Sequence, residues 1–430
     1  MKLKTGYILS INFLIILFII LGANTYDKKE NYPKNETQEL EARDGLPNFF
    51  DKAMRGDSIK VAYLGGSITA QAGWRVYSLE WFQQRFPKAI FSEINAAIGG
   101  TGSDFGVFRL KDHVLQFHPN LVFVEFAVND SKTPSEKIIR SMEGIVRQIW
   151  QHNSKTDICF IYTFKEDFLE QLQNGLQPYS ILAMEKVANK YKIPTINFGI
   201  EVSKLVGNNQ LIVKHKSEEL DGVKVFSSDG VHPNLKIGHN IYLDALERSF
   251  EKMGVGGKSK KHKLKKPLAA NYFSNTRMLD ITQCILSDNW TVFPVKEDPN
   301  IKNFGRYLTH VGKSGQSGET LTVRFKGRAI GAYDIMGPDA GKVIIEIDGL
   351  VMDTISRFDK YCTYWRMGYI LMDHLEDKDH VAVFKVLAEP FDKESILKQR
   401  GNTMENPEKY KENNWYVGKI LVDGKLETSH

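Results

Sequence analysis

Short apolar runs alternate with amphipathic stretches between about residues 59 and 250. The runs have the length and content of buried strands, and they read "KVAYLGGS", "AIFSEINAA", "NLVFVEFAV", "DICFIYTF" and "IPTINF". Between and after them, apolar residues recur every three or four positions, as in helices. These stretches are "WRVYSLEWFQQRF", "SEKIIRSMEGIVRQIWQHN", "YSILAMEKVANKYK" and "IGHNIYLDALERSFEKM". Strands separated by helices predict right-handed βαβ units and a parallel α/β sheet covered on both faces.

The pattern changes near residue 254. The basic stretch 254–267 contains "GGKSKKHKLKKP", which predicts a solvated linker. Beyond it, runs such as "TLTVRF" and "HVAVFKV" alternate apolar and polar residues, with the turn sequences "MGPDAG" and "IDGL" nearby. This half shows little helical periodicity. The sequence therefore predicts an α/β domain over 56–253 and an all-β sandwich domain over 268–430.

The beginning of the chain has the pattern of an export signal. "MKLK" is followed by the apolar run "GYILSINFLIILFII", which is shorter than the roughly 20 residues that span a bilayer. We predict a signal peptide or N-terminal anchor over 1–23 and a polar spacer over 24–55. The protein is accordingly expected to be exported to the periplasm, cell surface or medium. Membrane association is expected only if the first segment is not cleaved.

Composition narrows the functional classes. Of 430 residues, 42% are hydrophobic and 25% charged, as in globular proteins. The net charge of +5 lies largely in the stretch 254–267, so no nucleic-acid partner is predicted. Three scattered cysteines are too few for a disulfide framework or a zinc cluster, and Cys159 reads as a buried small hydrophobe.

Residues suited to acyl transfer follow the predicted strands. In an open parallel sheet, ligands bind beyond the carboxyl ends of the strands. Ser67 follows the first strand, a glycine-rich loop follows the second, and Asn129 follows the third; Asp229 and His232 precede the last helix. A serine hydroxyl becomes a good nucleophile when an imidazole accepts its proton and a carboxylate orients that imidazole. Backbone N–H groups and an amide side chain can stabilise the resulting oxyanion.

Four blocks make this set more specific. "GGSIT", "INAAIGGTGS", "VEFAVND" and "DGVHPN", in this order, resemble the SGNH hydrolases, also called GDSL-type esterases and lipases. The resemblance covers about residues 59–250 and implies a flavodoxin-like three-layer fold. It also implies that Ser67 is the nucleophile, His232 the general base and Asp229 its orienting partner. The oxyanion donors would be the backbone N–H groups of Ser67 and Gly100 and the side chain of Asn129, and no cofactor or metal is implied.

Some features depart from the family or allow another interpretation. Gly66 replaces the aspartate of the GDSL tetrapeptide, and Ala127 replaces a glycine of the third block. Gly99 and Gly102 are alternatives to Gly100 as the glycine donor. A serine after a strand is often only a turn or helix-cap residue, and aspartate and histidine near the last helix, including His239, are also suitable metal ligands.

Two residues beyond the serine are candidates for substrate binding. Trp74 could stack on a sugar ring and Arg75 could meet an acidic group, with core packing as the alternative for the tryptophan. Glu125 lies inside the third predicted strand and would need a partner there, for which Arg75 and Arg109 are the candidates.

Three features favour a carbohydrate ester as substrate: the predicted export, the β-sandwich partner domain, and the lack of a broad apolar lid. The combination resembles two-domain acetylxylan-type and other carbohydrate esterases in architecture. We therefore predict an esterase that removes acyl groups, above all acetyl groups, from a polysaccharide or glycan. The alternatives are a GDSL-type lipase or thioesterase for longer acyl chains, and a catalytically inactive glycan-binding protein.

Overall fold

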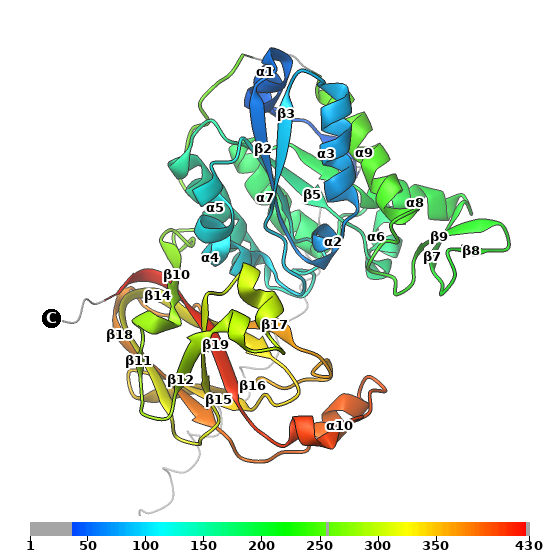
Figure 1. Cartoon of the computed structure of the whole chain (residues 1–430). Coiled ribbons are helices and arrows are strands. Elements are labelled where there is room, and N and C mark those ends of the chain that lie inside the picture. Colours follow the sequence, from blue (N-terminus) through cyan, green and yellow to red (C-terminus); the bar gives the residue numbers. More distant parts are fainter. Residues whose placement is uncertain (1–36, 255–257, 427–430) are drawn as a thin grey trace, which may run out of the picture. The chain divides into compact units, whose positions relative to one another are not determined.

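The computed structural model describes residues 37–254 and 258–426 (Figure 1). The predicted signal peptide or anchor and the start of the predicted spacer lie outside these ranges. Within them, no helix is both long enough and apolar enough to cross a membrane.

The first half of the described chain forms a six-stranded sheet in the order β1-β6-β5-β4-β2-β3. Its strands are β1 (Leu40–Glu41), β2 (Ser58–Gly65), β3 (Ile90–Asn95), β4 (Leu121–Glu125), β5 (Asp157–Tyr162) and β6 (Thr195–Asn197). All neighbouring strands from β2 to β6 are parallel, and only β1 joins antiparallel, at the edge beside β6. The five parallel strands have the flavodoxin-like order that the resemblance implied.

Helices cover both faces of this sheet. They are α1 (Pro47–Arg55), α2 (Ser67–Ala70), α3 (Trp74–Arg85), α4 (Ser103–His113), α5 (Ser135–His152), α6 (Leu169–Gln173), α7 (Tyr179–Tyr191), α8 (Gly199–Gly207) and α9 (Gly238–Met253). Strand side chains alternate between two cores: in β2, Ala62 and Leu64 pack with α4, α5 and α7, whereas Val61 and Tyr63 pack with α1, α3 and α9. The continuous apolar run of β2 is thus explained by burial on both faces.

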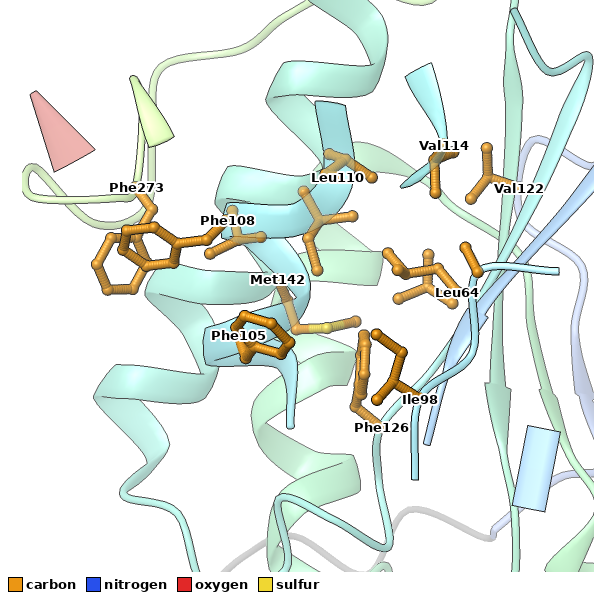
Figure 2. Close-up of a cluster of buried hydrophobic side chains, with 14 of the residues drawn as sticks. Leu64, Ile98, Phe105, Phe108, Leu110, Val114, Val122, Phe126, Met142 and Phe273 are labelled. Carbon is orange, nitrogen blue, oxygen red and sulfur yellow. The ribbon is translucent and has the colours of Figure 1, made fainter. Parts of the chain in front are cut away.

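The core on the side of α4 and α5 is shown in Figure 2. Leu64 and Val122 from the sheet, Phe105 and Phe108 from α4, and Met142 from α5 lie in the same cluster. Phe273, which follows the basic stretch, packs against Phe108 with ring centroids 5.3 Å apart. The α/β core therefore extends to residues from the second half of the chain.

The described part of the predicted spacer is ordered, which corrects that prediction. Residues 47–55 form α1, and Phe49 and Phe50 are buried. Leu46, Phe49, Phe50 and Ala53 recur at helical spacing, and Gly56 ends the helix with a positive φ of 81°. The polar residues around this short apolar stripe concealed it, so the folded domain begins upstream of residue 56.

A small three-stranded sheet precedes α9. It consists of β7 (Leu211–Lys214), β8 (Glu219–Leu220) and β9 (Val223–Ser227), and the sequence patterns did not predict it. The last of these strands, β9, is followed directly by the loop 228–237, which contains the DGVHPN block.

The second half of the described chain is an antiparallel β domain, as predicted. A ten-stranded sheet contains β10 (Thr276–Asp280), β11 (Ile285–Leu286), β12 (Thr291–Pro294), β13 (His310–Ser314), β14 (Thr320–Met336), β15 (Lys342–Ile347), β16 (Leu350–Ser356), β17 (Arg366–Met372), β18 (Lys378–Leu387) and β19 (Trp415–Leu426). The long β14 pairs with β18 through its first half and with β17 and β19 mainly through its second. This change of partners along one strand is consistent with a sandwich.

Short helices lie in the connections of the β domain. They are η3 (Ile281–Gln283), η4 (Val295–Glu297), η5 (Lys302–Arg306), α10 (Lys393–Lys398) and η6 (Pro407–Tyr410); the α/β domain also has η1 (Leu115–Phe117) and η2 (Glu166–Phe168).

The basic stretch before the β domain is attached to the α/β domain. Its lysines are exposed, but the ring of His262 stacks on Trp150 with centroids 4.7 Å apart. His262 Nε2 also lies 2.7 Å from Oδ1 of the fully buried Asp157. The lysine side chains are thus solvated as predicted, but the stretch is also attached to the α/β domain, through His262 and through bonds of Ser259 and Lys260 to Asn48, which the sequence did not indicate.

Candidate active site

Ser67 is the first residue of the short helix α2, directly after β2. Gly66 precedes it in an extended conformation, with φ −92° and ψ −153°. The strand runs into the helix without a longer loop, so the serine stays at the carboxyl end of the sheet. This is the place that the apolar run followed by "GGS" predicted.

His232 and Asp229 form a hydrogen-bonded chain with this serine. Ser67 Oγ lies 2.7 Å from His232 Nε2, and His232 Nδ1 lies 2.7 Å from Asp229 Oδ2. The serine and the histidine are 165 residues apart in sequence. The arrangement can transfer the hydroxyl proton to the imidazole, with the carboxylate fixing the tautomer that leaves Nε2 free to accept it.

The loop that carries the aspartate and histidine is built largely from its own hydrogen bonds. Asp229 Oδ1 accepts the backbone N–H groups of Val231 and His232 at 2.9 and 2.8 Å and the hydroxyl of Ser227 at 2.9 Å. Gly230 has a φ of +83°, a conformation that favours glycine. Asn234 ends the loop by accepting the N–H of Ile237 at 2.7 Å, just before α9. The block DGVHPN thus encodes a turn that presents the histidine.

The carboxylate of this loop stays ionised. Partial burial alone would raise the pKa of Asp229, but the hydrogen bonds donated by His232, Val231 and Ser227 outweigh it. They hold the pKa well below its usual value. A negative charge at this position is suited to stabilising an imidazolium, should His232 accept a proton.

The side chain of Asn129 lies against Gly66, which directly precedes Ser67. A Cβ atom added to Gly66 would lie 2.0 Å from Asn129 Oδ1. Asn129 follows the end of β4, and its side chain is half-buried. The glycine that replaces the family's aspartate therefore leaves room for the amide close to Ser67.

The loop 96–102, hereafter the oxyanion loop, connects β3 to α4 and passes beside Ser67. A Cβ atom on Gly99 would lie 3.5 Å from Ser67 Cβ. Gly100 has a φ of +73°, and a Cβ there would meet no other atom within 4 Å. Both glycines are exposed. Gly99 is thus the glycine shown close to Ser67, and the assignment of Gly100 as a donor stays a prediction, with Gly99 as its alternative.

Two buried carboxyl groups hold the segments around the site together through hydrogen bonds. The sequence reasoning gave neither group this role. Glu125, at the end of β4, accepts hydrogen bonds from the hydroxyls of Thr69 and Thr163 at 2.8 and 2.7 Å. Burial raises its pKa. Asp130, next to Asn129, accepts the backbone N–H of Ser103 at 3.1 Å. Acidic residues directly after the apolar run of β4 were the available sequence signal.

The predicted partners of Glu125 are wrong. Arg109 donates hydrogen bonds to the carbonyl oxygens of Ala96 and Gly65, the latter at 3.1 Å. Arg75 donates to the carbonyl of Thr69 and forms an ion pair with Glu93. Short threonine hydroxyls satisfy Glu125 instead: Thr69 reaches it from α2 and Thr163 from the residue after β5.

The structure also corrects the two predicted substrate-binding residues. Trp74 is 1% exposed, and its ring packs against Tyr63 and Phe123 in the core. Arg75 is 5% exposed and is occupied by the contacts described above. Their position at the start of α3 turns both side chains inward. The alternative of core packing therefore holds for Trp74.

The alternative of a metal site at Asp229, His232 and His239 is not supported by their positions. His239 is fully buried at the start of α9, where its Nδ1 accepts the backbone N–H of Trp74 at 3.1 Å. Its Nε2 lies 3.2 Å from Gln71 Oε1. This histidine is used to join α9 to the start of α3, while His232 faces the serine.

Comparison with known proteins places the chain in context. Residues 63–237 match the GDSL-like lipase/acylhydrolase family. This segment contains Ser67, Asn129, Asp229 and His232. No curated protein matches the chain in sequence.

Two solved structures resemble both halves of the chain. One is a two-domain esterase active on acetylated mannans, co-crystallised with mannopentaose, with 21% identity and a TM-score of 0.66. The likeness covers 90% of this chain and 95% of that one. The other is a two-domain esterase active on acetylated mannans, with 20% identity, a TM-score of 0.68 and coverage of 90% and 96%. At this identity the likeness establishes the shared two-domain fold.

Proposed function

We propose that the protein, whose residues 63–237 match the GDSL-like lipase/acylhydrolase family, is a carboxylic ester hydrolase that removes acetyl groups from a polysaccharide or glycan through an acyl-serine. The observation that carries the proposal is the hydrogen-bonded chain from Ser67 through His232 to Asp229. A glycan as substrate is favoured by the likeness of both domains to esterases active on acetylated mannans.

The reaction would begin with attack of Ser67 Oγ on the ester carbonyl while His232 Nε2 takes the hydroxyl proton. The carbonyl oxygen becomes an oxyanion, which the backbone N–H groups of Ser67 and Gly100 and the amide of Asn129 would stabilise. When the tetrahedral intermediate collapses, the sugar alcohol leaves with the proton from His232. Water then attacks the acyl-serine with the imidazole again as base, releasing acetate and the free serine.

The test measures acetate release from acetylated polysaccharides, acetylated mannan and xylan among them, together with hydrolysis of 4-nitrophenyl acetate and long-chain 4-nitrophenyl esters. We expect the acetate ester and at least one polysaccharide to be turned over. Ser67→Ala and His232→Ala should each lower kcat by at least about 10³-fold, because each removes a reacting group. Circular dichroism should show that both variants remain folded.

Other outcomes would select the alternatives. A marked preference for long acyl chains would indicate a lipase or thioesterase. Absence of turnover in the intact protein, with retained binding to a glycan, would indicate a binding protein and overturn the proposed hydrolysis. Full activity of Ser67→Ala would contradict the nucleophile.

A further inference from the structure

The oxyanion loop is held from both domains. Within the α/β domain, the backbone N–H of Ile98 donates to the carbonyl of Gly65 at 3.0 Å, and Arg109 donates to the carbonyl of Ala96. Gly99 and Gly100, the part beside the serine, are exposed and receive no such support from side chains of α4. Glycine has the largest conformational freedom of any residue, so this segment depends on how its two ends are fixed.

The β domain fixes the first end. Arg306, at the end of η5, donates a hydrogen bond from Nη2 to the carbonyl oxygen of Asn95, the last residue of β3. The hydroxyl of Tyr307 donates to the carbonyl of Ala97 at 3.4 Å. Both acceptors lie shortly before the exposed glycines in sequence.

The β domain also fixes the second end. The hydroxyl of Tyr369, in β17, donates to Asp104 Oδ1 at 2.8 Å, in the first turn of α4. The Tyr369 ring stacks on Phe105 with ring centroids 4.9 Å apart. The Tyr333 ring packs against the same phenylalanine with ring centroids 4.6 Å apart. Phe105 and Tyr333 are fully buried, and Tyr369 is half-buried. The start of α4 is therefore attached to the β domain by a partly buried hydrogen bond and by packing.

We propose that the β domain positions the oxyanion loop, with Tyr369 and Arg306 as positioning residues for the esterase reaction. The inference rests on the proposed function and extends it, because it gives the second domain a role in the chemical step itself. An oxyanion donor acts fully only when its N–H is fixed before the reaction. A small displacement of such a donor lowers the rate even when the substitution that causes it is remote from the substrate.

The experiment uses full-length variants and 4-nitrophenyl acetate, an ester too small to need a carbohydrate-binding surface. Tyr369→Phe removes the hydroxyl that reaches Asp104 and keeps the ring on Phe105. We expect kcat and kcat/KM to fall about tenfold with KM unchanged, because the loop is loosened while the groups that bind the substrate stay the same.

Tyr333→Phe is the matched control. This tyrosine packs on the same phenylalanine, and within the described residues its buried hydroxyl has no hydrogen-bond partner. Removing that hydroxyl should leave kcat unchanged. A comparable decrease of kcat in both variants would indicate general loosening of the domain interface and would overturn the specific role of Tyr369.

Arg306→Leu tests the other end independently, at an exposed side chain whose replacement leaves the core intact. We expect a decrease of kcat similar to that of Tyr369→Phe, and about 10²-fold for the double variant. Unchanged kcat in both single variants, with melting temperatures near that of the wild type, would overturn the proposal. Ser67→Ala separates the two hypotheses: if it is inactive while these variants are fully active, the esterase function stands and only the positioning role fails.

Discussion

At the scale of single residues, Gly66 is the departure from the family tetrapeptide that matters most to the site. Its backbone conformation is extended, which any residue can adopt, so the requirement for glycine lies in the space it leaves. A Cβ atom added to Gly66 would lie 2.0 Å from Asn129 Oδ1 and 2.8 Å from Asn129 Cγ, both far too close. The position of the Asn129 amide therefore depends on the absence of a side chain at residue 66.

We predict that Gly66→Ala lowers kcat about 10²-fold by displacing the Asn129 side chain, as expected for loss of one oxyanion donor. Steady-state kinetics on 4-nitrophenyl acetate measure this. Asn129→Ala should cause a similar decrease, and combining the two changes should add little because both act on the same amide.

The control for this prediction is Gly207→Ala. A Cβ on this α8 glycine would meet only Gln173 Nε2, at an ordinary 3.7 Å, so activity should not change. If Gly66→Ala retained wild-type kcat, the assignment of Asn129 as an oxyanion donor would be wrong.

Residue-scale reasoning succeeded for the loop and failed for α3. Asp229 and His232 are three residues apart, and their mutual hydrogen bonds are local, so their spacing carried the information. Trp74 and Arg75 are also close to the serine in sequence, but the start of α3 turns them into the protein. Proximity in sequence did not indicate the direction of those side chains.

At the scale of elements, Asp130 links β4 to the amino terminus of α4. Its carboxyl group accepts the N–H of Ser103, the first residue of the helix. Burial, assisted by the nearby charge of Asp104, raises the pKa of Asp130 to about 7, although the hydrogen bond from Ser103 lowers it. The ordinary value is 3.8.

This raised pKa predicts a pH-dependent stability. Between about pH 4 and 7 the folded protein retains a proton that the unfolded chain releases, so the free energy of unfolding falls as the pH rises through this window. From pH 5 to 8 the contribution is about 2–3 kcal/mol. Chemical denaturation should show that Asp130→Asn, which cannot ionise, loses less stability over this range than the wild type.

Comparing the pH dependence of the free energy of unfolding in the wild type and in Asp130→Asn removes the contributions of titrating groups that do not interact with Asp130. Burial also raises the pKa of Glu125, whose charge in turn raises that of Asp130, so the difference between the two curves reports the Asp130 carboxyl together with its coupling to Glu125. Parallel stability curves for the wild type and Asp130→Asn would show that Asp130 is ionised in the folded protein throughout the range.

The elements themselves were largely predictable from periodicity. Strands β2 to β6 and helices α3, α5, α7 and α9 lie in the stretches that the pattern of apolar residues indicated. The helix α1 was missed because its apolar stripe is short, and β7 to β9 were missed because strands of two to five residues carry too few positions for a period.

At the scale of the whole molecule, the basic stretch between the domains is attached to the α/β domain at several points, and His262 is the one whose ring reaches a buried carboxylate. His262 contacts Trp150 and Asp157, and Asp157 also accepts the side-chain N–H of Asn48 and the backbone N–H of Phe49, at 2.9 and 2.8 Å. Asp157 begins β5, at the end of the sheet opposite to Ser67. This attachment therefore concerns the joining of the domains and not the chemistry.

We predict that His262→Ala lowers the free energy of unfolding by about 1–3 kcal/mol, because the buried Asp157 loses a hydrogen-bond partner. Denaturation curves measure the change, and kcat on 4-nitrophenyl acetate should stay at the wild-type value. Lys263→Ala, at the exposed neighbouring position, should change stability by less than about 0.5 kcal/mol. Equal effects of the two variants would contradict an anchoring role for the histidine.

Export and the cleavage of the segment 1–23 stay predictions, since they concern residues outside the described ranges. The proposed glycan substrate is likewise a whole-molecule inference, because it draws on the pairing of an esterase domain with a β domain.

The sequence by itself determined the order of β2 to β6 and of the longer helices between them, the parallel sheet followed by antiparallel strands, and the turn that brings Asp229 to His232. Each of these follows from residues that are neighbours in the chain, through apolar periodicity and local hydrogen bonds. Only the tertiary structure decided that His232 reaches Ser67 across 165 residues, that Trp74 is a core residue, and that Tyr369 fastens the start of α4. Periodicity states which face of an element is apolar, but the surface that this face meets depends on how the whole chain packs.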